Sequence, residues 1–149
     1  MHYMATLSAV WKQIGDFDLE TLDGRIIFQK TIYLLQRAGL SLGYTFSWYI
    51  FGPYSSQLAK DGFEINEGNI IYPTQECKLD PAPFNKLKEL IRGHEKDEVW
   101  YELLASIDFL KKEKNLSKDK ILEELKRKHS YLGDETKFEE AWSLIESLK

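Results

Sequence analysis

The stretch RIIFQKTIYLLQRA (residues 25–38) is the strongest helix signal in the chain, and it determines how the rest can fold. Ile27, Thr31 and Leu34 recur at helical spacing, and further apolar positions widen this stripe over most of the helix surface. A helix that is apolar nearly all round is a buried helix, so we expect it at the centre of the core. Gly39 follows at the position where a helix C-terminus favours glycine.

The residues around this helix predict a small α+β lobe. A helix is expected before it, and an aromatic strand, a short helix beginning near Ser55 or Ser56, and a second short strand are expected after it. The predicted elements are residues 4–14, YTFSWYIF (44–51) ended by Gly52-Pro53, Tyr54–Gly62, and NIIY (69–72). This order of elements is typical of a winged-helix-like lobe with two or three short strands.

The second half of the chain predicts a lobe of four helices. A proline-rich connector, Pro73–Pro83, separates it from the first half. The expected helices span 81–92, 96–112 and 118–128, with a last one over about 136–148. Asp80-Pro81 and Ser117 are the expected starts of two of them, and a Thr136-x-x-Glu139 capping box is expected to start the last. The predicted class is mainly α (α+β), as one domain over 1–149 with sub-lobes 1–73 and 81–149.

Composition excludes several broad classes of protein. The chain is 43% hydrophobic and 30% charged, which is typical of a globular domain and not of a disordered or membrane-spanning one. No stretch reaches the ~18 apolar residues of a membrane span, and the N-terminus has no signal-peptide pattern. Cys77 is the only cysteine, which fits a reducing compartment. We therefore expect a cytoplasmic protein with no membrane partner.

Residues 28–61 resemble a known group of proteins. The pattern is a buried helix with a Lys-x-x-Tyr-Leu element, an aromatic segment, and a Gly-Pro-Tyr-Ser turn into a helix. The matching residues are Lys30, Tyr33, Leu34, Gln36, Gly52 and Pro53. In these features the chain is similar to the uncharacterised YwgA-like proteins and, more distantly, to the Panacea antitoxin domain, which includes the SocA proteolytic adaptor. The resemblance implies a small, mainly helical, non-enzymatic module that binds a protein partner.

The aromatic segment is the first candidate binding surface. If residues 44–51 form a strand, both of its faces carry rings, and only one face can pack on the helix over 25–38. The other face is either covered by the helical lobe, as simple core packing, or exposed to a partner. The turn after the strand is either a structural corner or part of the same surface. The candidate partner-binding residues are Trp48, Tyr49, Phe51, Gly52, Pro53, Tyr54 and Ser55.

A basic segment is the second candidate. Residues 111–128 hold eight basic and four acidic side chains, although the whole chain has a net charge of −4. The candidate contacts to nucleic acid or to an acidic partner are Lys112, Lys114, Lys118, Lys120, Arg127 and Lys128. The alternative is a solvated helix end, where cations complement the helix dipole.

Catalytic and metal-binding patterns are not recognisable in the sequence. His2, His94 and His129 are far apart from one another and from Cys77, whereas metal sites commonly use close pairs of ligands. We expect no metal, no cofactor and no enzyme activity. The predicted function is a regulatory module that binds a protein partner, antitoxin-like or adaptor-like. The alternatives are a winged-helix-type nucleic-acid-binding regulator and, after that, a small hydrolase.

Overall fold

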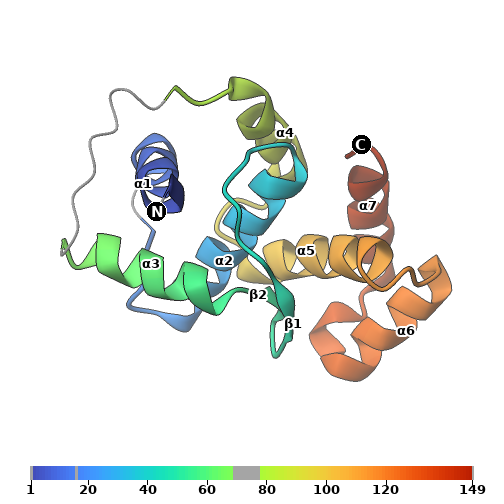
Figure 1. The fold of residues 1–149 in the computed structure, drawn as a ribbon. Helices are drawn as coiled ribbons and strands as arrows, with labels where there is room; N and C mark the ends of the chain where they lie inside the picture. Colours follow the sequence, from blue (N-terminus) through green and yellow to red (C-terminus); the bar gives the residue numbers. More distant parts are fainter. Residues whose placement is uncertain (1, 16, 69–77, 149) are drawn as a thin grey trace.

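The computed structural model describes residues 2–15, 17–68 and 78–148, and within them the fold is mainly helical (Figure 1). The first half contains α1 (His2–Ile14), α2 (Leu22–Arg37), β1 (Ser47–Tyr49), β2 (Gly52–Tyr54) and α3 (Ser56–Asn66). The second half contains α4 (Pro81–Ile91), α5 (Glu98–Lys112), α6 (Lys118–Lys128), the 3-10 turn η1 (Ser130–Leu132) and α7 (Glu135–Glu146). The predicted mainly α (α+β) class is confirmed. None of the described helices is long and apolar enough to cross a membrane.

Two helices from different halves of the chain form the centre of the core. Helix α5 crosses the middle of the molecule and packs along α2, while α6 and α7 lie at one end and α1 and α3 at the other (Figure 1). Every residue of α5 from Trp100 to Leu110 is buried. One hydrophobic cluster contains residues from both predicted sub-lobes, so the halves share a single core.

The expected helix ends are mostly confirmed. Gly39 adopts φ +117°, and its N–H donates to Gln36 O at 3.1 Å, which closes α2 as a glycine C-terminus does. Asp80 caps α4 and Ser117 caps α6 through their side-chain oxygens. The capping box predicted at Thr136 is wrong, because α7 starts earlier, with Asp134 as its cap.

The carboxylate of Asp134 accepts hydrogen bonds from the backbone N–H groups of Thr136 and Lys137, at 3.0 and 3.1 Å. Two orphan donors of the first turn are thereby satisfied, and Thr136 lies inside the helix. An aspartate two residues upstream is as good a cap as threonine, so spacing alone chose the wrong residue.

The aromatic segment differs from the single strand expected over 44–51. Only Ser47–Tyr49 is a strand, and Gly52–Tyr54, expected to end it, forms the second strand of an antiparallel hairpin. Trp48 pairs with Pro53, which a two-stranded sheet tolerates because both strands are edges. Gly52 adopts φ +93°, a conformation that favours glycine at the end of a tight turn.

The second expected strand, NIIY (69–72), lies outside the described residues, as do Cys77 and the first part of the proline-rich connector. Helix α3 was expected to end at Gly62 but continues to Asn66. Its N-cap is Ser55, whose hydroxyl accepts from Leu58 N at 3.1 Å, so the first of the two serines considered is the cap.

Candidate functional site

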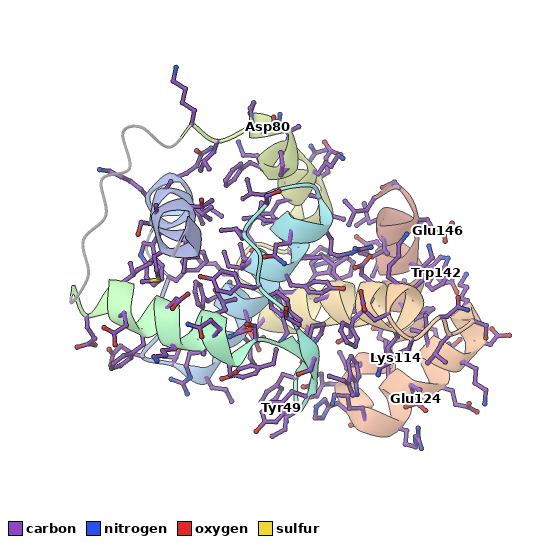
Figure 2. The ribbon with its side chains drawn as sticks, in the orientation of Figure 1. Tyr49, Asp80, Lys114, Glu124, Trp142 and Glu146 are labelled. Atoms are coloured by element: carbon purple, nitrogen blue, oxygen red, sulfur yellow. The ribbon has the colours of Figure 1, made fainter. Side chains whose placement is uncertain are left out.

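Rings of the hairpin point alternately into the protein and away from it. Trp48 is half-buried and stacks on Phe109 of α5, with centroids 5.7 Å apart. Tyr49 is 56% exposed and packs against Tyr54, with centroids 5.1 Å apart. Figure 2 shows Tyr49 at the tip of the hairpin, at the edge of the molecule. One face of the segment therefore belongs to the core, and the other is available to a partner.

An apolar cavity, here called the hairpin pocket, lies between the hairpin, α2 and α3. Its volume is about 280 Å³. Six large hydrophobic side chains are exposed in the described part of the chain, and four of them line this one cavity: Leu22, Tyr49, Ile50 and Phe63. The remaining walls come from Leu19, Arg25, Ile26, Phe28, Gln29, Lys30, Phe51, Tyr54 and Ala59. Exposed apolar side chains that gather around a hollow are typical of a binding site.

Three of the seven expected partner-binding residues are buried and do not reach the surface. These are Gly52, Pro53 and Ser55, and the last is only 2% exposed. Their contacts are with the rest of the protein, and they shape the hairpin. A Cβ at position 52 would lie 2.5 Å from Ser106 Oγ, so glycine is needed there for the close approach to α5 as well as for its φ.

Side chains of α2 hold the hairpin in place. Gln29 forms a pair of 2.9 Å hydrogen bonds with Ser55, donating from Nε2 to its carbonyl and accepting at Oε1 from its N–H. Lys30 Nζ donates to Pro53 O at 2.9 Å. No role was predicted for Gln29 from the sequence, and Lys30 was singled out only as part of a resemblance. The sequence did carry a signal for both residues, because a polar residue inside an otherwise apolar helix needs a buried hydrogen-bond partner.

A group of polar side chains, here called the Lys30–Glu102 cluster, lies where α2, α5 and the end of α6 approach the hairpin. Glu102 of α5 is 1% exposed and accepts a 2.9 Å hydrogen bond from Tyr131 OH. Its second carboxylate oxygen is 3.8 Å from His129 Nε2. Burial raises the pKa of Glu102, and burial lowers the pKa of Lys30 to about 8. Because Lys30 and Glu102 are far apart in sequence, no local motif could predict that they would meet.

The cluster continues to the hairpin tip through the end of α6. Lys128 Nζ donates to Tyr49 O at 2.5 Å and lies 4.7 Å from the centre of the Trp48 ring. His129 Nε2 is 2.9 Å from Ile50 O, and since a carbonyl only accepts, this nitrogen carries the hydrogen. These contacts attach the tip of the hairpin to the C-terminal helices.

A second buried network joins α2 to α5. Asp108, which is fully buried, accepts from Tyr33 OH and from Arg37 Nε, both at 2.7 Å. Burial raises the pKa of Tyr33, and the adjacent Asp108 carboxylate adds to that shift. The network clamps the two central helices together, and it does not line the hairpin pocket.

The basic segment is largely paired with acids. Lys118 contacts Glu139 at 2.7 Å and Lys120 contacts Glu123 at 3.5 Å, while Arg127 is paired with Glu124. Of the six expected nucleic-acid contacts, Lys112 and Lys114 are exposed near the end of α5, and Lys128 binds the hairpin. Basic and acidic side chains therefore alternate around α6 and α7, the part of the molecule where Figure 2 labels Lys114, Glu124 and Glu146.

The two histidines with described side chains have structural contacts. His94 stacks on Trp100 with centroids 3.9 Å apart, and His129 stacks on Tyr131 at 4.8 Å. Within residues 2–15, 17–68 and 78–148, no three His, Cys, Asp or Glu side chains are arranged to hold a metal ion.

No family model, no curated protein and no solved structure matches the chain. The resemblance to YwgA-like proteins and the Panacea domain therefore stays a prediction.

Proposed function

We propose that this protein is a non-enzymatic regulatory module that binds a protein partner through the hairpin pocket. The observation that carries the proposal is the gathering of Leu22, Tyr49, Ile50 and Phe63 around one cavity. Each has about half of its surface exposed, which is unfavourable in water unless another molecule covers it. A partner that inserts an apolar side chain would bury these four residues together.

The size of the cavity is compatible with a protein partner that inserts one or two side chains. At about 280 Å³ it is slightly smaller than the usual range of roughly 300–1,000 Å³ for small-molecule pockets. It suits one or two anchor side chains, and aromatic residues such as Tyr49 are the ones that carry most binding energy at protein interfaces.

The placement of the titratable groups supports a non-enzymatic role. Lys30 and Glu102 are 2% and 1% exposed, and their polar atoms are turned to Pro53 O and Tyr131 OH. A general acid or base has to reach its substrate within hydrogen-bond distance. The Lys30 ammonium is bound to a hairpin carbonyl, and Glu102 is bonded to Tyr131 and is not part of the cavity lining.

The nucleic-acid alternative has less support. Affinity for phosphates depends on basic side chains that stay available to release counterions. Here Lys118, Lys120 and Arg127 already have carboxylate partners, and the net charge of the chain is −4. Measuring duplex binding at low and high salt tests this alternative, and a salt-dependent affinity would revive it.

The proposal is tested by placing a photo-crosslinking residue at position 50 and identifying what it captures in the source cell. The captured protein is then purified and its affinity measured against wild type, Tyr49→Ala and Phe63→Ala. Ile14→Ala is the matched control, because Ile14 is also an exposed apolar residue but does not line the pocket. We expect roughly tenfold weaker binding for the two pocket variants and no change for the control. Equal affinities for all four proteins contradict the proposal.

A further inference from the structure

Charged residues in the wall of the hairpin pocket are all of one sign. The polar side chains of the lining include Arg25, Gln29 and Lys30, and no described Asp or Glu belongs to it. The whole chain has an excess of acid, so a pocket wall with two cations departs from the average surface. This wall would attract a negatively charged group on whatever enters.

Arg25 is the cation that can touch a ligand. It lies exposed on the first turns of α2, and its Nη1 donates to Leu19 O at 3.0 Å. A guanidinium has five N–H groups in a planar fork, so this single hydrogen bond orients the group and leaves donors for a carboxylate. The side chain is thus held at the pocket wall in a geometry that suits a bidentate contact.

Lys30 acts through its charge and not through contact. Its Nζ is held beneath the hairpin at Pro53 O and is nearly inaccessible. Lys128 adds a further positive charge at Tyr49 O, near the tip of the same hairpin. The nearby carboxylate is that of Glu102, which accepts a hydrogen bond from Tyr131 OH and whose pKa is raised by burial.

Acidic residues do occur in the sequence beside the lining. Asp18, Glu20 and Asp23 are exposed next to Leu19 and Leu22. Asp18 is engaged locally, because its carboxylate accepts from Glu20 N at 3.0 Å and from Thr21 Oγ1 at 3.3 Å. Because Arg25 donates to Leu19 O, these acids lie at the Arg25 end of the pocket and oppose an anionic ligand there. The direct contact of the ligand with Arg25, together with the charges of the hairpin lysines, has to outweigh this repulsion.

We propose that the segment bound in the hairpin pocket is an apolar anchor side chain flanked by a carboxylate, and that Arg25 binds that carboxylate. This inference rests on the proposed function and specifies the chemistry of the partner. The apolar walls bind the anchor, and the cationic wall selects acidic over neutral or basic flanking residues.

The test uses three short fluorescent peptides that share a Phe-Leu anchor and carry Glu, Gln or Lys on both sides of it. Binding is measured by anisotropy for wild type, Arg25→Gln, Arg25→Lys and the Ile14→Ala control. We expect the Glu peptide to bind wild type about tenfold more tightly than the Gln peptide, with a difference that shrinks as salt rises. Arg25→Gln should abolish the difference, and Arg25→Lys should keep part of it as a point charge.

Each outcome supports or overturns the inference. Equal affinities for the Glu and Gln peptides overturn the inference about charge and leave the proposed function standing. A straight-chain fatty acid that binds while none of the peptides does overturns both, because the site is then one for small molecules. If none of the peptides binds and the captured partner binds wild type and Tyr49→Ala with equal affinity, the inference about charge and the proposed function are both overturned. If Arg25→Gln unfolds, the salt dependence of the Glu–Gln difference in wild type decides instead, and a difference that salt does not change overturns the role of charge.

Discussion

The two sides of the hairpin differ in the chemistry of their contacts. On the side of α5 and α6, polar contacts hold the hairpin, as Lys30 Nζ donates to Pro53 O and Lys128 Nζ donates to Tyr49 O. On the side of α2 and α3, Ile50 and Phe63 stand half-exposed around a cavity. Buried polar networks specify one arrangement because every alternative leaves a group unpaired, whereas apolar surface accepts any covering of the right shape. We infer that the polar side positions the hairpin and the apolar side binds.

The largest expected effect of a single substitution is at Asp108, in the second buried network. Asp108→Ala leaves Tyr33 and the partly exposed Arg37 without their shared acceptor. We expect the free energy of unfolding to fall by roughly 2–4 kcal/mol, reduced from the full value for a buried pair because Arg37 is one-third exposed. Urea titration measures it. The matched control is Glu124→Gln, which breaks an exposed pair and should cost less than about 0.5 kcal/mol.

The next effect tests how closely the hairpin approaches α5. Gly52→Ala places a methyl group 2.5 Å from Ser106 Oγ and forces an L residue to φ +93°. We expect a loss of about 1–3 kcal/mol in unfolding free energy. Ser106→Ala alone should be nearly neutral, because its buried hydroxyl has no hydrogen-bond partner in the described structure. The double variant should recover only the steric part, and full recovery would show that the backbone is unstrained.

A smaller effect is a dependence of the unfolding free energy on pH, and it tests the burial of Lys30. The folded-state pKa of Lys30 is lowered to about 8 from 10.5, mainly by burial. Between these values the unfolded chain holds the proton and the folded chain has released it, so stability rises with pH across this window. Relative to Lys30→Met, the wild type should gain roughly 1 kcal/mol per pH unit between pH 8 and 10.5. A flat difference would mean that the ammonium is solvated.

The smallest expected effect on stability is on the apolar side. Phe63→Ala removes a ring that is 55% exposed, so the unfolding free energy should change by less than about 0.5 kcal/mol. The same variant is expected to weaken partner binding. Thermal unfolding beside the affinity measurement separates the two, and a large loss of stability would mean that this side also holds the fold together.

Local signals predicted the helices well and the hairpin poorly. Caps such as Asp80 and Ser117 act within a few residues of themselves, so their role is visible in the sequence. Gly52-Pro53 was interpreted as the end of a strand because both residues usually interrupt strands. It forms a strand here because Lys30 of α2 donates a hydrogen bond to the Pro53 carbonyl. In addition Gly52, which has no Cβ, fits closely beside Ser106 of α5.

The aromatic residues indicated the segment that carries the candidate site, but they did not indicate which of its residues are buried. Ring density pointed to the segment around Trp48 and Tyr49, and the alternation of a strand left open whether its second face is covered by the helical lobe or exposed. Which neighbours cover each face depends on α3, α5 and α6, whose relative positions no periodicity encodes. Ser55 was placed at the surface for that reason, yet it is buried by its bonds to Gln29.

Short windows of the sequence were sufficient to predict the helical class and the buried character of α2, because both follow from local periodicity and composition. The meeting of Lys30, Glu102 and His129, and the gathering of four exposed apolar residues around one pocket, came only from the packing of distant elements. Those groupings join residues tens of positions apart, and their energies depend on burial and distance. Both quantities exist only once the chain has folded.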